Sequence, residues 1–190
     1  THNKLELEQY FSSASLSKLM ASMMNYNYDE IDLLDPGAGI GSLFVACVDE
    51  IFTRKLKPKK ISITAYEIDK SLFSYLEESL KQCKTLCEKN KVKFTGKIIK
   101  KDFIVDIVEN LKSSDKKQFS HIIINPPYKK INIFSEVYRI LKKVNLPSAN
   151  LYTAFIALSE KVLKENGEIV FISPRSFCNG PYFQSFRKKF

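Results

Sequence analysis

Apolar runs of strand length alternate with amphipathic stretches of helix length along most of the chain, and this alternation constrains the fold more than any other feature of the sequence. Hydrophobic periodicity predicts strands at residues 31–34, 61–67, about 92–101, 119–125 and 168–174. It predicts helices at about 14–26, 41–52, 70–90 and 133–143, a short one after Asp102, and one from about 150 to a cap at Gly167. Strands separated by helices form parallel β-α-β units. The predicted fold class is therefore α/β, with a mostly parallel central sheet and helices on both faces.

The length of 190 residues predicts one domain over residues 1–190, with a short N-terminal helical segment at residues 1–28. Ser12 or Ser13 can cap the first helix. No apolar run approaches the roughly 20 residues that span a bilayer, and the polar start lacks the charged and apolar regions of a signal peptide. We therefore expect a soluble cytoplasmic protein with no membrane partner.

Few residues in the chain can support metal or histidine chemistry. The four cysteines include no C-x-x-C pair, and only two histidines are present, His2 and His121. A metal site and histidine-based acid/base catalysis are both unexpected. Thirty Lys and Arg against 21 Asp and Glu give a net charge of +9, which favours a nucleic-acid partner. A lysine-rich surface that serves only solubility is the alternative.

Polar or turn motifs follow four of the predicted strands, each at the point where its strand ends. They are DPGAGIG (35–41), Glu67, Asp102 and NPPY (125–128). Ligands of open parallel sheets bind beyond the carboxyl ends of the strands, where the strand order reverses. One shared site is therefore more economical than four unrelated loops.

The first motif carries glycines at positions 37, 39 and 41, which let the backbone turn sharply and approach a ligand closely. A tight turn without a ligand is the alternative interpretation. Ser42 stands where a dinucleotide fingerprint needs glycine, and the chain has no phosphate-binding P-loop motif. A ligand with an adenosine but no phosphates fits best, and S-adenosylmethionine meets that description.

Two further strand ends can hold the adenosine. Glu67 can accept hydrogen bonds from both ribose hydroxyls, or it can be an ordinary exposed carboxylate. Asp102 can accept from the adenine amino group while Phe103 covers the base. In the competing interpretation Asp102 caps a helix and Phe103 belongs to the core.

The NPPY corner has a coherent chemistry of its own. Its two prolines, Pro126 and Pro127, stiffen the backbone and remove two N–H donors, so nearby carbonyls and the amide oxygen of Asn125 can act as acceptors at one spot. An exocyclic amino group on a flat ring supplies two donors to that spot, and Tyr128 offers a stacking face. Two acceptors holding the amine favour a pyramidal nitrogen that can attack a methyl donor. A rigid turn with a packed tyrosine is the alternative.

The sequence resembles the N6-adenine DNA methyltransferases of bacterial restriction-modification systems, most closely the PstI and BsuBI type of modification enzyme. The motifs that carry the resemblance run in order from about residue 8 to the end: QYFSS (9–13), DPGAGIGSL (35–43), YEID (66–69), KKDF (100–103), NPPY (125–128), NLYTAF (150–155) and FISPRSF (171–177). The resemblance implies a Rossmann-like catalytic and cofactor-binding domain, S-adenosylmethionine as methyl donor, and an adenine flipped out of duplex DNA as target. A cognate restriction endonuclease is an implied partner.

The resemblance also implies roles for individual residues. The cofactor residues would be Tyr10, Phe11 and Ser12 near the methionine end, Asp35, Gly37 and Gly39 in the glycine loop, Glu67 and Ile68 at the ribose, and Asp102 and Phe103 at the adenine, with Asn125 shared. The catalytic residues would be Asn125, Pro126, Pro127 and Tyr128, with no metal. Ser12 and Ser13 stand where many members of the family have Thr-Pro.

Motif order resembles the gamma group, because the cofactor motifs precede NPPY and only 23 positions separate Asp102 from Asn125. In that group a DNA-recognition domain follows the catalytic core. We expect that this domain and the last hairpin of the core lie outside these residues, so that the chain is a fragment that binds cofactor but methylates poorly.

Several alternatives stay open. The same corner suits methylation of a protein glutamine or of an RNA base, cytosine N4 is chemically close to adenine N6, and a non-catalytic subunit of a restriction complex is a third possibility. Lys129 and Lys130 can contact DNA phosphates, with Arg175, Arg187, Lys188 and Lys189 extending that surface, or these charges can simply be solvated.

Overall fold

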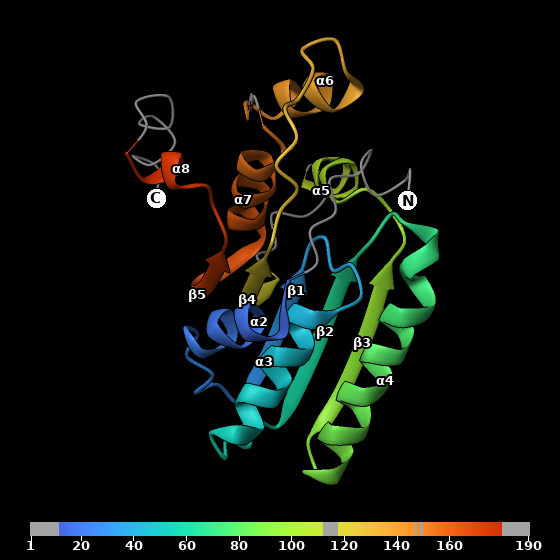
Figure 1. The fold of residues 1–190 in the computed structure, drawn as a ribbon, viewed down its shortest axis with the longest axis vertical. Coiled ribbons are helices and arrows are strands. Elements are labelled where there is room, and N and C mark those ends of the chain that lie inside the picture. Colours follow the sequence, from blue (N-terminus) through green and yellow to red (C-terminus); the bar gives the residue numbers. More distant parts are fainter. Residues whose placement is uncertain (1–11, 112–117, 147, 149, 180–190) are drawn as a thin grey trace.

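The computed structural model describes residues 12–111, 118–146, 148 and 150–179. Within this part of the chain a five-stranded parallel sheet has the order β3-β2-β1-β4-β5 (Figure 1). The strands are β1 Glu30–Asp35, β2 Lys60–Tyr66, β3 Lys93–Ile99, β4 Phe119–Ile124 and β5 Leu163–Phe171. The chain moves outward from β1 to β3 and then returns to the other side of β1, so the order reverses between β1 and β4. The predicted α/β class is confirmed.

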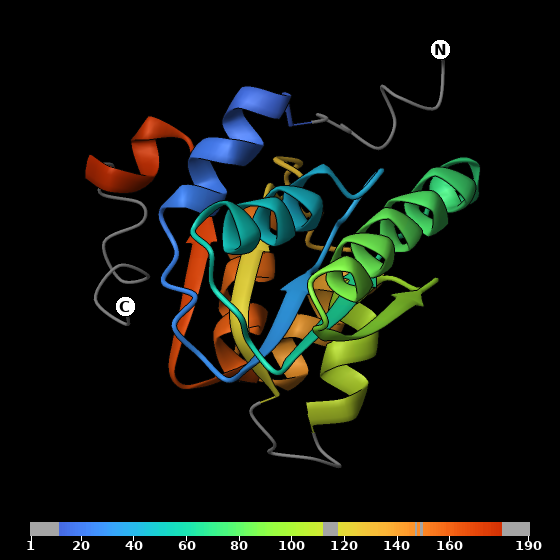
Figure 2. The same ribbon diagram turned by 90° about the horizontal axis from the view of Figure 1, so that it is seen from below.

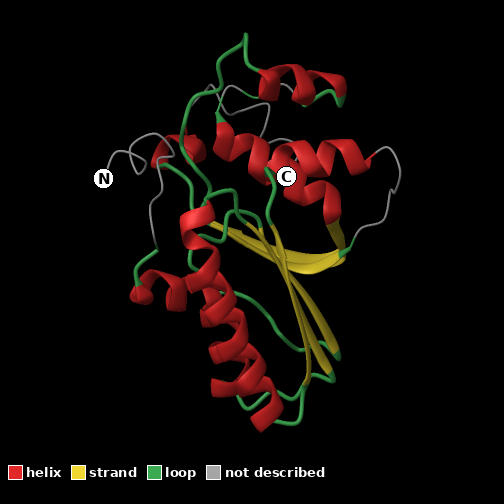
Figure 3. Ribbon diagram, turned by 90° about the vertical axis from the view of Figure 1, so that its right-hand side faces the viewer, coloured by secondary structure: helices red, strands yellow, loops and turns green. Residues whose placement is uncertain are grey.

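Helices cover both faces of the sheet (Figures 2 and 3). One face carries α2 Ala14–Ser22, α3 Ser42–Thr53 and α4 Phe73–Lys89, the last preceded by the 3₁₀ turn η1 Lys70–Leu72. The other face carries α5 Phe103–Leu111 and α7 Leu151–Val162, while α6 Glu136–Lys143 packs against α5 beyond the carboxyl ends of the strands, and a short helix, α8 Arg175–Asn179, follows β5. None of the described helices is long and apolar enough to cross a bilayer.

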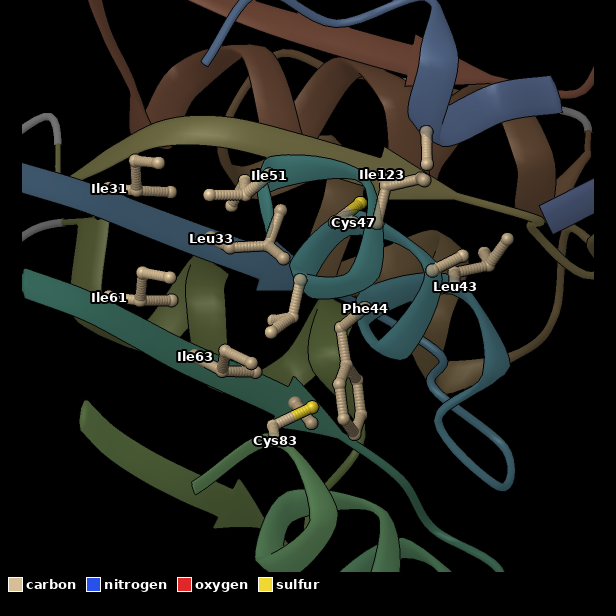
Figure 4. Close-up of a cluster of buried hydrophobic side chains, with 14 of the residues drawn as sticks. Ile31, Leu33, Leu43, Phe44, Cys47, Ile51, Ile61, Ile63, Cys83 and Ile123 are labelled. Carbon is tan, nitrogen blue, oxygen red and sulfur yellow. The ribbon is translucent and has the colours of Figure 1, made fainter. Parts of the chain in front are cut away.

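The central strands β1 and β4 are covered on both faces, and alternate residues of each point to opposite sides of the sheet. On the face of α3, Ile31 and Leu33 of β1 and Ile61 of β2 belong to one buried cluster with Cys47 and Ile51 of α3 (Figure 4). Residues one position along, such as Leu34, face α5 and α7 instead. This two-sided burial explains why β4 reads as a nearly continuous apolar run, whereas β2 and β3 carry polar residues such as Ser62, Thr64 and Lys97 on their less covered face.

The segment after α2 is attached to β4 through His121. Nε2 of His121 lies 2.7 Å from the carbonyl oxygen of Asn25, and Nδ1 lies 2.8 Å from Oγ of Ser120. Because a carbonyl oxygen only accepts, Nε2 carries the hydrogen and Nδ1 accepts from the serine. Burial lowers the pKa of this histidine. His121 is thus a neutral structural group that joins the N-terminal helix to the sheet.

Several element ends differ from the sequence-based prediction; helix α6, predicted from residue 133, begins only at Glu136, because Ser135 caps it. Helix α2 is predicted to run to residue 26 but ends at Ser22, since the following residues form the link to His121. The predicted helix cap at Gly167 is wrong: α7 ends at Val162, and β5 already begins at Leu163. Pairing with β4 shifts between Phe119↔Leu163 and His121↔Glu168, so residues 164–167 form a bulge, with Asn166 at φ 60°.

Candidate active site

The glycine loop turns tightly at the carboxyl end of β1. The φ values of Gly37, Gly39 and Gly41 are 152°, 56° and 90°, and residues other than glycine rarely adopt such positive values. A Cβ on Gly41 would lie 2.4 Å from Cζ of Phe44. Ser79 of α4 donates a hydrogen bond of 2.6 Å to the carbonyl of Ile40. The glycines therefore meet a backbone requirement at the edge of the sheet, as the sequence predicts.

Glu67 binds this loop from the end of β2. Its Oε2 accepts from the N–H of Gly39, and its Oε1 accepts from the N–H groups of Ile68 and Asp69, each at 2.8 Å. Only 7% of the residue is exposed, which rules out an ordinary exposed carboxylate. A carboxylate has about four acceptor positions, so three are in use. Accepting from both hydroxyls of a ribose would require one of these N–H groups, such as that of Gly39, to move.

Asp35 is a second buried carboxyl group at the same place. Within the described part of the chain its Oδ2 is buried and makes no hydrogen bond. Burial, and then the nearby charge of Glu67, raise the pKa of Asp35 to about 8, although the backbone N–H of Phe44 acts in the opposite direction. The side chain is therefore largely a neutral acid at pH 7. A neutral carboxylic acid can donate a hydrogen bond as well as accept one.

Asp102 and Phe103 follow β3 and begin α5. Oδ1 of Asp102 accepts a 3.0 Å hydrogen bond from the N–H of Val105, which is a helix cap. Phe103 is 2% exposed and packs against Tyr66 and Phe155, with ring centroids 5.2 and 5.1 Å apart. In this structure Asp102 is therefore a helix cap and Phe103 a core residue, which is the alternative to a cofactor contact that the sequence left open. Oδ2 of Asp102 is not engaged by that cap and is the atom that could meet an adenine amino group.

The NPPY corner leaves β4 beside the glycine loop, because β4 pairs with β1 through Leu33↔His121 and Leu34↔Ile122. Both ends of the corner are fixed: the N–H of Ile172 donates to the carbonyl of Ile124 at 3.1 Å, and the N–H of Leu151 donates to the carbonyl of Lys129 at 2.9 Å. The corner is therefore held to the sheet on one side and to α7 on the other.

Side chains of the corner have defined partners as well. Nδ2 of Asn125 donates to Oγ of Ser12 at 3.1 Å. The Tyr128 ring lies 5.9 Å from the ring of Tyr152 at an angle of 43°, and burial raises the pKa of Tyr128. Pro126 is buried and Pro127 half-buried. Residues 125–128, which we call the ledge, therefore form a stiff segment that carries an amide at Asn125 and an aromatic face at Tyr128.

The structure thus gathers Ser12, the glycine loop, Glu67, Asp102 and the NPPY corner at one edge of the sheet. Ile68 is half exposed and touches this group through its backbone N–H. Tyr10 and Phe11 lie outside the described residues, as do Arg187, Lys188 and Lys189. In the described ranges no group of three or more His, Cys, Asp or Glu side chains could hold a metal ion.

Sequence reasoning missed residues that support the site from behind. Phe155 of α7 packs on Phe103, and its Cε1 would lie 3.5 Å from a Cβ added to Gly37, so one ring touches two strand-end motifs. Tyr152, one turn earlier, packs on Tyr128. Both belong to the stretch NLYTAF, and their spacing of three on one helix is the signal that could have found them.

Comparison with known proteins places these motifs in context. The family described as Eco57I restriction-modification methylase matches residues 10–190. The chain is 41% identical to the type II methyltransferase M.BsuBI of Bacillus subtilis over 98% of its own length and 37% of that protein. It is 42% identical to the type II methyltransferase M.PstI of Providencia stuartii over 97% of its length and 36% of that protein. The chain therefore spans little more than a third of these relatives.

Solved structures share the fold at low sequence identity. The methyltransferase subunit of a type I restriction-modification system from Streptococcus thermophilus matches with a TM-score of 0.62 at 18% identity, over 94% of this chain and 38% of that one. A protein provisionally described as a class I S-adenosylmethionine-dependent methyltransferase, from Listeria monocytogenes, matches with a TM-score of 0.61 at 12% identity, over 98% and 56%. The sheet and its helices thus have the arrangement of that fold class.

Proposed function

The chain belongs to the Eco57I restriction-modification methylase family, and from this we propose that its protein transfers a methyl group from S-adenosylmethionine to the N6 amino group of an adenine flipped out of a specific duplex DNA sequence. The methylation would protect that sequence from a cognate restriction endonuclease. One observation carries the proposal: the rigid Asn125–Tyr128 ledge adjoins the glycine loop where the strand order reverses.

The residues around the glycine loop fit such a cofactor. The uncommitted, buried Oδ2 of Asp35 calls for a polar partner, and Glu67 and the loop lie beside it. We assign Asp35, Gly37 and Gly39 to the methionine part, Glu67 and the backbone of Ile68 to the ribose, and Asp102 with Phe103 to the adenine. Bound there, S-adenosylmethionine would supply an electrophilic methyl group.

The ledge would hold the amino group that attacks. The Asn125 amide is oriented by the hydrogen bond from its Nδ2 to Ser12, which directs its Oδ1 the opposite way. Oδ1 and the carbonyl of Pro126 would accept the two amino hydrogens, while the face of Tyr128 supports the base. Acceptors held still before the reaction reduce its reorganisation cost, so positioning rather than a charged base supplies the rate enhancement.

The net charge of +9 supports DNA as the substrate. Lys129 and Lys130 directly follow the ledge and are exposed, so they are placed to contact phosphates next to the flipped nucleotide. We further propose that sequence recognition lies in parts of the protein beyond this catalytic domain, since the relatives are much longer.

The test is methyl transfer from labelled S-adenosylmethionine by the protein at its natural length. Duplex DNA, RNA and a protein extract serve as parallel substrates, and the DNA is digested to nucleosides for mass spectrometry. The proposal predicts label in duplex DNA as N6-methyldeoxyadenosine. N4-methyldeoxycytidine would contradict the choice of base, and label in RNA or protein alone would contradict the choice of substrate.

A further inference from the structure

Two large apolar side chains stand in solvent a few residues after the ledge. Ile133 is 60% exposed and Phe134 is 83% exposed. They occupy the turn before α6, on the segment that rises from β4 beyond the carboxyl ends of the strands (Figures 1 and 3). Single exposed apolar residues are common, but two adjacent ones form a contiguous apolar point of the kind that marks an interaction site.

Hydrogen bonds and a buried neighbour fix the turn that carries Ile133 and Phe134. Ile131, two residues earlier, is buried in the core with α5 and α7. Oδ1 of Asn132 accepts a 2.9 Å hydrogen bond from the N–H of Phe134, and the Asn132 carbonyl accepts one of 2.9 Å from the N–H of Ser135. The Ser135 hydroxyl then accepts from the N–H of Tyr138 and caps α6. Ile133 and Phe134 are therefore held outward on a short anchored tip.

Positive charge surrounds the tip. Residues 129–143 contain five basic side chains and one acidic one, all of them exposed: Lys129, Lys130, Arg139, Lys142, Lys143 and Glu136. A phosphate backbone complements this balance, whereas an apolar protein surface does not. Cations around an exposed apolar point are the combination that proteins use to insert a side chain between DNA bases.

We propose that Ile133 and Phe134 form a wedge that enters the base stack of duplex DNA beside the target nucleotide and stabilises its flipped-out state. This inference rests on the proposed function, because it assumes that DNA is the substrate. The wedge follows Tyr128 by five residues, so the element that opens the stack and the ledge that receives the base belong to one segment. Lys129 and Lys130 would contact the DNA phosphate backbone, while Ile133 and Phe134 would replace the stacking that the flipped-out base gives up.

The test compares Phe134→Ala and Ile133→Ala with the unaltered protein, using two DNA duplexes. In one the target adenine is paired, and in the other it lies opposite an abasic site, where flipping is easier. Tyr75→Ala is the matched control, since Tyr75 is an aromatic residue of α4 that is 63% exposed on the opposite face of the sheet. All variants are checked for melting temperature.

The wedge predicts that Phe134→Ala lowers kcat/KM about tenfold or more on paired DNA and that the abasic partner restores most of the loss. Ile133→Ala should act in the same direction, and Tyr75→Ala should change neither substrate. Equal rates for Phe134→Ala and the unaltered protein, or an equal loss on both duplexes, would overturn the wedge. An equal loss with a lower melting temperature would mean instead that another protein surface covers the pair.

A second readout separates this inference from the proposed function. With 2-aminopurine at the target position, flipping raises the fluorescence of bound DNA whether or not a methyl group is transferred. The wedge predicts a large rise with the unaltered protein and a small one with Phe134→Ala at saturating protein. Failure of methyl transfer with this fluorescence difference intact would refute the proposed function alone, and methyl transfer without the difference would refute the wedge alone.

Discussion

Nδ2 of Asn125 donates a hydrogen bond of 3.1 Å to Oγ of Ser12, across 113 positions of the sequence. Ser12 precedes the cap residue of the first described helix, and Asn125 opens the NPPY ledge. The N-terminal segment thus sets the orientation of the amide on which the proposed chemistry depends. This contact gives a role to a serine that neither core packing nor charge would single out.

Ser12→Ala removes the acceptor and should let the Asn125 amide rotate. We expect methyl transfer at saturating substrates to fall about fivefold, which corresponds to the loss of about 1 kcal/mol of orienting energy. The neighbouring Ser13→Ala is the matched control, because the Ser13 hydroxyl accepts from the N–H of Leu16 as the helix cap. That variant should lose about 1 kcal/mol of stability without a rate effect. Equal rates in Ser12→Ala and the unaltered protein would contradict the orienting role.

Glu67→Gln should disturb the glycine loop. A glutamine turns one acceptor oxygen into a donor NH₂, which must then face the N–H of Gly39 or those of Ile68 and Asp69. We expect a stability loss of about 2 kcal/mol and at least about tenfold weaker S-adenosylmethionine binding, measured by thermal unfolding and calorimetry.

Glu77→Gln provides the comparison for that experiment. Glu77 forms a 3.0 Å ion pair with Lys100 in which both side chains are about half exposed. Removing such a surface pair should cost about 0.5 kcal/mol or less and leave cofactor binding unchanged. If the two glutamine variants behave alike, Glu67 does not hold the loop in the way the hydrogen bonds indicate.

Asp35→Asn should make the protein more stable, and more so at higher pH. The pKa of Asp35 is about 8 in the folded protein and about 3.8 when unfolded. Between these values the unfolded chain has released a proton that the folded protein keeps, so stability falls as pH rises, on the order of 1 kcal/mol per pH unit. The asparagine variant lacks this loss, so its free energy of unfolding in urea should exceed that of the unaltered protein by an amount that grows from pH 5 to pH 8. A difference independent of pH would contradict the buried, neutral carboxyl group.

Gly41→Ala should be strongly destabilising. Its φ of 90° disfavours alanine, and the new Cβ would lie 2.4 Å from Cζ of Phe44. We expect a loss of about 2 to 3 kcal/mol in denaturant unfolding. Gly96→Ala also adds one methyl group, but it meets the flexible end of Leu80 at 3.0 Å and should cost less. A larger loss at Gly96 would show that strain in the loop is not what requires glycine.

The sequence-based prediction of the fold succeeded where local pattern and chain order suffice. Apolar residues mark the strands, most completely in the fully buried β4, and the carboxyl ends of the parallel strands meet at one edge with DPGAGIG and NPPY on it. The predicted end of α7 at Gly167 is wrong because it relied on glycine being a common helix terminator. In the structure Gly167 follows Asn166 in a bulge of β5. Residues 163–171 form a strand because they pair with β4, which lies about 40 positions earlier in the sequence, and no local pattern contains that pairing.

Details of the site depended on tertiary contacts that no local pattern contains. The three N–H groups on Glu67, the Oδ2 of Asp35 that makes no hydrogen bond within the described residues, and the ring of Phe155 behind Phe103 arise when loops from different strands meet. The sequence could name these acidic residues as candidates, but not whether they are buried. Phe103 shows the same limit, since both a core position and a contact with adenine suit a phenylalanine after a strand.

The most direct test of the ledge is the single-turnover rate of methyl transfer to duplex DNA by Asn125→Ala, at saturating S-adenosylmethionine and DNA in the protein at its natural length. Saturation removes any effect on binding, so the rate reports the step in which the amide oxygen holds the amino group. We predict a fall of about a hundredfold or more, with an unchanged melting temperature. A rate equal to that of the unaltered protein would contradict the account.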